Sequence, residues 1–152
     1  MVFLGLGSNL GERRQLLEQA ISLLETEGGH VAAISSFVET EPWGFESQHR
    51  FLNAVVALET PLAPYALLEL AQDIERRLGR AEKTQRQDGK PQWSDRPIDI
   101  DILLWDDVCV NDAPRLVIPH PLMEQRPFVM EPLREVRALL LEKENAGSPV
   151  AG

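Results

Sequence analysis

Two extended segments, at about residues 31–38 and 51–60, follow each other with only a turn-rich stretch between them, and this constrains the fold more than any other feature. The second segment alternates as a strand does, with its side chains divided between two faces: Leu52, Ala54, Val56 and Leu58 on one, and Phe51, Asn53 and Val55 on the other. Consecutive strands joined by a turn favour an antiparallel sheet. A Rossmann unit, by contrast, places a parallel strand directly after its first helix.

Helical periodicity surrounds these strands. Apolar residues recur at helical spacing over residues 12–27, and a second helix is expected over 64–79, where Pro64 suits the first turn and Gly79 the end. With further strands at 2–6 and 98–105, the order becomes β-α-β-β-α-β. This order predicts a ferredoxin-like α+β fold, an antiparallel sheet with helices packed on it in α/β/α layers.

The length and the hydrophobic content favour one compact domain that needs no disulfide. The chain has 152 residues, 43% of them hydrophobic, and we expect a single domain over 1–142 with a disordered tail at 143–152. Its one cysteine, Cys109, excludes an internal disulfide, and its neighbours Val108 and Val110 suggest that it is a small buried hydrophobe. The amino-terminal residues lack the basic and long apolar stretches of a signal or membrane segment, so we expect a cytoplasmic location.

The charge is distributed very unevenly. The formal net charge is −9, but residues 76–96 hold seven basic and three acidic side chains, a net of +4, whereas the rest holds eight basic and 21 acidic, a net of −13. An anion would be attracted to the basic segment, although a solvated polar loop has the same composition. We expect small-molecule substrates, no nucleic-acid or membrane partner, and a monomer.

The stretch LGLGSNLGERRQLL joins the first strand to the first helix. Its glycines, Gly5, Gly7 and Gly11, are spaced one residue too widely for the dinucleotide fingerprint, and no Lys-Ser/Thr follows as in a P-loop. We therefore favour a tight turn, for which glycine supplies a positive φ, over a phosphate cradle. Ser8 and Asn9 could border a binding site, but capping of the helix is the favoured interpretation.

An acidic pair lies in RPIDIDILLW. Asp99 and Asp101 are two residues apart on a strand, so both carboxylates project from the same face. The Cα atoms that carry them are about 6.6 Å apart. The side chains of residues 98, 100, 102 and 104 are expected to pack on the opposite face. Carboxylate oxygens are ligands that Mg²⁺ prefers, and such a pair could bridge two metal ions. A polar sheet face is the alternative, and the adjacent basic segment ending at Arg96 favours metal and phosphate chemistry.

Five segments in order, GLGSNLG, ETEPWG with FLNAVVALET, IERRLGR, RPIDIDILLW and IPHPLMEQRPFVMEPL, resemble the 6-hydroxymethyl-7,8-dihydropterin pyrophosphokinases of folate biosynthesis. The resemblance runs from Gly5 to about Val136. It implies a magnesium-dependent kinase that uses two Mg²⁺ ions and transfers pyrophosphate from ATP to the hydroxymethyl group of the pterin, releasing AMP. The alternative hypothesis is a ferredoxin-like module that binds nucleotide or pterin without turnover.

The resemblance also implies roles for individual residues. It places metal ligation at Asp99 and Asp101, and a catalytic role at these two residues together with Arg80 and Arg96. The implied pterin site comprises Thr40, Pro42, Trp43, Phe51, Asn53, Trp93 and Phe128. The implied ATP site comprises Gln72, Glu75, Arg80, Arg96, Ile102, Arg115, His120 and Arg126. Taken singly, Phe51 and Phe128 could be core aromatics, His120 a turn residue and Arg126 a surface arginine.

The residues themselves support part of this assignment. Phe51 and Asn53 share one strand face, and a flat heterocycle is held well by aromatic rings and an amide that both donates and accepts hydrogen bonds. The segment 81–95 contains one large apolar residue, Trp93, and is expected to act as a lid that lays this ring against the pterin.

The chain departs from the family pattern at three places. Glu82 stands where a second base is usual, which leaves Lys83, Arg86 and Lys90 as alternative phosphate contacts. Pro121 replaces an aromatic residue after His120, and Glu41 replaces a second proline. We expect these departures to affect tuning more than identity.

Overall fold

The computed structural model describes residues 1–41, 50–79, 85–87, 90–92 and 97–147. Its main sheet is built from β1 (Val2–Ser8), β2 (His30–Ile34), β3 (Val38–Thr40), β4 (Phe51–Glu59) and β7 (Asp99–Trp105). Its helical elements are α1 (Arg13–Leu23), the π-helical turn η1 (Leu24–Gly28), α2 (Pro64–Arg77), the 3₁₀ turn η2 (Met123–Gln125) and α3 (Pro127–Gly147). Two small antiparallel pairs complete it: β5 (Gln85–Gln87) with β6 (Lys90–Gln92), and β8 (Val110–Asp112) with β9 (Leu116–Ile118).

The sheet is antiparallel and has the order β2-β4-β1-β7, with β3 also paired to β4. Strand β1 is therefore central and lies between β4 and β7. This arrangement confirms the α+β, ferredoxin-like fold. The predicted strand at 31–38 is divided into β2 and β3. Ile34 pairs with Val56 but Val38 pairs with Asn53, so four steps along this segment oppose three along β4. Between them, the hydroxyl of Ser35 accepts a hydrogen bond from the backbone nitrogen of Val55.

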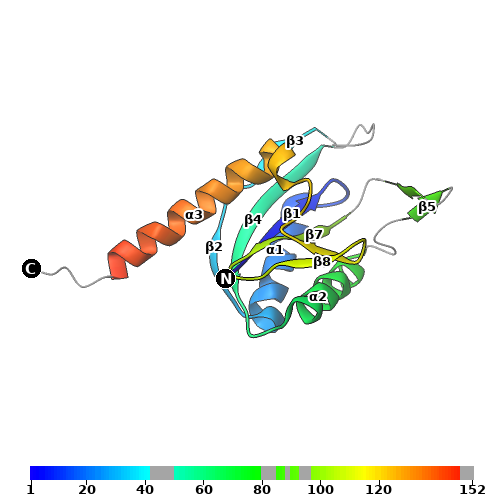
Figure 1. The fold of residues 1–152 in the computed structure, drawn as a ribbon. Helices are drawn as coiled ribbons and strands as arrows, with labels where there is room; N and C mark the ends of the chain where they lie inside the picture. Colours follow the sequence, from blue (N-terminus) through cyan, green and yellow to red (C-terminus); the bar gives the residue numbers. More distant parts are fainter. Residues whose placement is uncertain (42–49, 80–84, 88–89, 93–96, 148–152) are drawn as a thin grey trace, which may run out of the picture.

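Helices cover both faces of the sheet, as Figure 1 shows. One core cluster lies between the sheet and α1 and α2, and includes Leu4, Leu24, Leu58, Leu67 and Ile100. The other lies beneath α3 and includes Phe3, Val55, Leu103, Leu133 and Val136. Strand β4 contributes to both clusters through its alternating side chains, so the two-faced pattern of residues 51–60 is confirmed.

The helix α3 was not identified from the sequence. Its buried residues Val129, Leu133 and Val136 recur at helical spacing, but Pro127 and Pro132 break the usual helical composition. The helix continues to Gly147, so residues 143–147 are helical and the tail does not begin at 143 as expected. Figure 1 shows its carboxyl-terminal part extending beyond the sheet.

Three local predictions about side chains were wrong. Cys109 is exposed, because it lies in the short connection between β7 and β8 rather than in a buried strand. Leu104 packs beneath α3 instead of behind the aspartates, since the ladder between β1 and β7 shifts register at Leu103. The N-cap of α1 is Glu12, whose side chain makes no capping bond, so neither Ser8 nor Asn9 holds that position. Both Ser8 and Asn9 are buried.

The glycines of the first segment also differ from expectation. Gly5 and Gly7 lie within β1, and of the glycines in that stretch Gly11 is the one with a positive φ, 75°. The turn therefore needs Gly11, whereas Gly5 and Gly7 serve another purpose. The ends of α2 agree with prediction: Pro64 begins it, and Gly79 follows it with φ 109°.

No helix within the described ranges is long and apolar enough to cross a membrane.

Candidate active site

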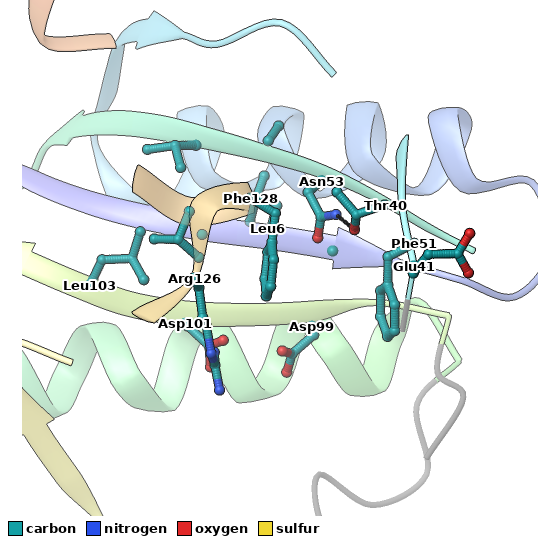
Figure 2. Close-up of a pocket in the computed structure, with 15 residues that line it drawn as sticks. Leu6, Thr40, Glu41, Phe51, Asn53, Asp99, Asp101, Leu103, Arg126 and Phe128 are labelled. Atoms are coloured by element: carbon teal, nitrogen blue, oxygen red, sulfur yellow. Dashed lines mark hydrogen bonds between the residues drawn. The ribbon is translucent and has the colours of Figure 1, made fainter. Parts of the chain in front are cut away.

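A pocket opens on the α3 face of the sheet, where β1 is flanked by β4 and β7 (Figure 2). The pairing of the three strands places two sets of three residues side by side across the floor of the pocket. Gly7 lies between Asn53 of β4 and Asp99 of β7, and Gly5 lies between Val55 and Asp101. The floor is therefore backbone in the middle, with functional side chains on both sides.

The two glycines leave space that a side chain would occupy. A Cβ atom at Gly7 would lie 3.1 Å from Oδ1 of Asn53 and 3.5 Å from Cδ1 of Phe51. A Cβ atom at Gly5 would lie 3.3 Å from Cδ1 of Leu103. Sequence reasoning missed this function, although the spacing of two residues within a strand places both glycines on one face. Gly5 and Gly7 thus form the floor of the pocket.

The aromatic part of the pocket comes from β4 and α3. Phe51 begins β4 and Phe128 lies in the first turn of α3, and both rings line the pocket. Figure 2 shows the Asn53 amide and Thr40 above the space between these rings. Nδ2 of Asn53 donates a hydrogen bond to Oγ1 of Thr40 at 2.6 Å. This bond fixes the amide and directs Oδ1 towards the glycine floor.

The charged part of the pocket lies along β7. Asp99 and Asp101 point into the pocket from one face of the strand, whereas Ile98, Ile100 and Ile102 belong to the opposite core cluster. Arg126 joins them from the residue before α3 and is only 5% exposed. Its guanidinium carbon lies 5.9 Å from the centre of the Phe128 ring. Arg126 is therefore a buried pocket residue and not the surface arginine considered as its alternative.

The donor set at β7 suits a hard cation that shares its ligands with substrate. Within the described ranges, no group of three or more His, Cys, Asp or Glu side chains is placed to hold a metal ion. Mg²⁺ is usually bound by one or two carboxylates, with waters and substrate phosphates completing its octahedron. Asp99 and Asp101 fit that requirement.

Glu75 holds the edge of strand β7 that faces away from β1, through a hydrogen bond to its backbone. This side chain of α2 is 2% exposed, and its Oε2 accepts a hydrogen bond from the backbone nitrogen of Ile100 at 2.9 Å. Ile100 lies between the two aspartates, at the edge of the sheet away from β1. The bond satisfies an edge N–H group and fixes the backbone that carries both carboxylates.

Loss of this contact has a measurable cost. We expect Glu75→Ala to lower the free energy of unfolding by about 1–3 kcal/mol, because the N–H of Ile100 loses its acceptor. The comparison variant is Glu75→Gln, whose amide oxygen still accepts and which should retain most of the stability. Urea unfolding measures both, and equal midpoints for Glu75→Ala and the parent protein would contradict this role.

The hairpin of β8 and β9 lies against α2. The hydroxyl of Tyr65 donates to Oδ2 of Asp112 at 2.6 Å, and this bond raises the pKa of Tyr65. Arg115 lies between β8 and β9. Its guanidinium carbon is 4.8 Å from the centre of the Tyr65 ring, and its Nη2 is 3.8 Å from Oε1 of Glu69. These contacts hold Arg115 beside α2.

His120 follows the hairpin and is fixed by two bonds. Its backbone nitrogen donates to the carbonyl of Leu103 at 2.8 Å, and its Nδ1 accepts from the backbone nitrogen of Leu122 at 3.2 Å. In the neutral ring the proton is therefore on Nε2, which makes that atom a donor.

The described residues expected in the site fall into two groups. Thr40, Phe51, Asn53, Asp99, Asp101, Arg126 and Phe128 line one pocket. Gln72, Glu75, Arg115 and His120 lie on α2 and around the hairpin, on the other side of β7, and Ile102 is buried in the core beneath α1 and α2. The roles expected for Pro42, Trp43, Arg80, Trp93 and Arg96 concern positions outside the described residues, as does most of the expected lid.

Comparison with known proteins identifies the family of the chain. The sequence model of a protein family described as 7,8-dihydro-6-hydroxymethylpterin-pyrophosphokinase matches residues 3–138, which include all the described pocket residues. The chain belongs to this pyrophosphokinase family. It is thus related to enzymes of folate biosynthesis, and the resemblance stated from its motifs is confirmed.

Individual relatives support the same assignment. A 2-amino-4-hydroxy-6-hydroxymethyldihydropteridine pyrophosphokinase of Porphyromonas gingivalis is 52% identical over 136 residues, 90% of each chain. The Bacillus subtilis protein of the same name is 40% identical over 137 residues, 90% of this chain and 77% of the relative. A crystal structure described as HPPK-DHPS in complex with substrates shares the fold, with a TM-score of 0.65, 14% identity and coverage of 95% of this chain and 43% of that one.

Proposed function

We propose that this pyrophosphokinase transfers the β,γ-pyrophosphate of ATP to the hydroxymethyl group of 6-hydroxymethyl-7,8-dihydropterin and releases AMP, in the synthesis of tetrahydrofolate. One observation carries the proposal. A single pocket joins two aromatic rings and a fixed amide to a pair of carboxylates, with the backbone of Gly5 and Gly7 between them. Such a pocket can hold a flat ring at one side and a metal-bound phosphate chain at the other.

The pterin side follows from Phe51, Phe128 and Asn53. Two rings that face a narrow space favour a flat heterocycle by stacking. The Asn53 amide, fixed by Thr40, can accept a hydrogen bond from ring N–H groups through Oδ1. With the ring placed there, its hydroxymethyl group would extend over Gly7 towards Asp99.

The nucleotide side follows from the carboxylates and from the residues beyond β7. Two Mg²⁺ ions held by Asp99 and Asp101 would neutralise phosphate charge and polarise the β-phosphoryl group. Arg126 would add a buried positive charge beside the same phosphates. Gln72, Arg115 and the Nε2 donor of His120 would bind the nucleoside part outside β7, while Glu75 and Ile102 hold that strand in place.

Transfer then depends mainly on alignment. The hydroxymethyl oxygen forms a bond to the β-phosphorus as the bond from that phosphorus to the oxygen of AMP breaks. The hydroxyl proton is released to water, AMP leaves as the phosphate monoester, and no covalent enzyme intermediate is needed. The chain orients the two substrates on one sheet face, and its buried charges stabilise the charge that develops on the phosphates. Arg80, Arg96 and Trp93 stay predicted participants in the reaction. The cytoplasmic location and the monomeric state also stay predictions.

The identity of the nucleotide product tests this reaction. The chain incubated with ATP, 6-hydroxymethyl-7,8-dihydropterin and Mg²⁺ should form AMP and pterin pyrophosphate in equal amounts, with none formed after chelation of the metal. Formation of ADP would show transfer of a single phosphoryl group. Binding of both ligands without a nucleotide product would favour the rival binding module.

Truncation of Asn53 tests the pterin side alone. We expect Asn53→Ala to weaken pterin binding by about 1–3 kcal/mol, because the ring loses a buried hydrogen-bond partner. The affinity for ATP should barely change, since Asn53 lies on β4 and the nucleotide contacts are assigned to β7 and beyond. Calorimetric titration with each ligand separates the two effects, and equal losses for both would refute the assignment.

A further inference from the structure

An ion-pair network lies at the rim of the pocket, where the chain leaves β3 and enters β4. Arg50 directly precedes β4, and its Nη2 lies 2.9 Å from Oε1 of Glu41, which directly follows β3. Its Nη1 lies 3.6 Å from Oε1 of Glu39. One arginine thus links two carboxylates at the end of the neighbouring strand.

Arg13, the first residue of α1, joins the same network. Its Nη2 lies 3.2 Å from Oε2 of Glu39, and its Nη1 donates to the backbone carbonyl of Arg50 at 2.8 Å. The beginning of α1 is therefore tied both to β3 and to the beginning of β4. We call Arg13, Glu39, Glu41 and Arg50 the rim network.

The rim network surrounds pocket residues without using their functional atoms. Thr40 lies between Glu39 and Glu41 and pairs with Phe51, the residue after Arg50. Glu41 itself lines the pocket, but Figure 2 shows its carboxylate directed away from the Asn53 amide. Strand β3 has only three residues, so its backbone ladder alone holds Thr40 weakly.

We propose that the rim network positions Thr40 and Phe51 for binding of the uncharged pterin ring, with Arg50 and Arg13 as positioning residues. The assignment of the ring rests on the proposed function, whereas the ordering of β3 and β4 does not. Glu41, one of the departures from the family pattern, acquires a role as a partner of Arg50. A network that orders the wall of a pocket before binding reduces the ordering that the ligand must otherwise supply.

The size of the effect is limited by exposure. The side chains of Arg50 and Glu41 are 59% and 70% exposed, and exposed ion pairs are individually weak. For Arg50→Ala we expect the KM for the pterin to rise about three- to tenfold, with the KM for ATP within about twofold of the parent value. Arg50→Lys should recover part of the loss, because it keeps the charge but not the two-pronged geometry.

Salt dependence gives a second readout. The pterin ring carries no charge, so any weakening of its binding by added NaCl must arise from charges in the protein. We expect this salt dependence in the parent protein and a smaller one in Arg50→Ala. Arg77→Ala is the matched control, because Arg77 is also an exposed arginine with two carboxylate partners, Glu27 and Asp73, but lies on α2.

Hydrogen exchange tests the network without a ligand. The backbone amides of Thr40 and Asn53 should exchange faster in Arg50→Ala than in the parent, and at the parent rate in Arg77→Ala. Unchanged exchange in Arg50→Ala would overturn the proposal, as would an equal loss of pterin and ATP affinity. If exchange responds but the parent protein does not bind the pterin, the proposed function fails while the ordering of β3 and β4 by the network stands.

Discussion

Asp101→Asn should lower the rate of AMP formation by at least about a hundredfold, with the fold intact. The substitution keeps the size of the side chain but removes the negative charge that would bind Mg²⁺, and loss of one preorganised charge-stabilising group costs about 10²–10³ in turnover. Asp101 projects from the side of β7 that faces the pocket, so its replacement should not disturb the core cluster beneath α1 and α2. Steady-state assays over a range of Mg²⁺ concentrations measure the effect.

Asp106→Asn is the matched control for this variant. Asp106 follows β7 directly, is exposed, and lies outside the pocket, so its replacement changes the net charge equally without touching the site. It should retain the parent turnover. Near-parent activity of Asp101→Asn at saturating Mg²⁺ would contradict the proposal that this carboxylate binds the metal.

Gly7→Val should nearly abolish pterin binding. Its Cβ atom would already lie 3.1 Å from the amide oxygen of Asn53, and two further methyl groups would fill the floor beside Phe51. Overpacking of a well-packed site costs about 1–3 kcal/mol, and here the added volume also occupies the space assigned to the ring. Calorimetry with the pterin should show this loss, whereas the affinity for ATP should fall much less.

Ala57→Val separates overpacking from occlusion of the pocket. Ala57 is fully buried on the same face of the sheet, pairs with Phe3, and does not line the pocket. It should lower the free energy of unfolding without weakening pterin binding. A Gly7→Val protein that folds and binds the pterin as the parent does would show that the floor between Asn53 and Asp99 is not part of the ligand site.

The sequence predicted the sheet well because its information there is local. Strict alternation in β4 and the Asp-Ile-Asp pattern in β7 each assign side chains to faces without any knowledge of the rest of the chain. The pairing of Gly7 with Asn53 and Asp99 depends on the register of three strands, which no single segment encodes. For this reason the segment by itself favours a turn, whereas Gly5 and Gly7 form the floor of the pocket.

Long-range contacts account for the other differences. The burial of Arg126 follows from the position of α3, a helix whose prolines hid its periodicity. The contact of Glu75 with Ile100 joins residues 25 positions apart, and its structural role cannot be seen in either segment alone. The rim network likewise brings Arg13 to Arg50, 37 positions away. Seven of the residues that the motif resemblance indicates line the pocket, but the motifs do not show which contacts hold them there.

A crystal structure of the chain with Mg²⁺, a non-hydrolysable ATP analogue and 6-hydroxymethyl-7,8-dihydropterin would show directly where both substrates and the metal ions bind. We expect the pterin ring between Phe51 and Phe128, with Asn53 within hydrogen-bonding distance, and metal ions bound to Asp99 and Asp101 next to the phosphates. A pterin bound elsewhere, or metal ions without contact to either aspartate, would contradict this expectation.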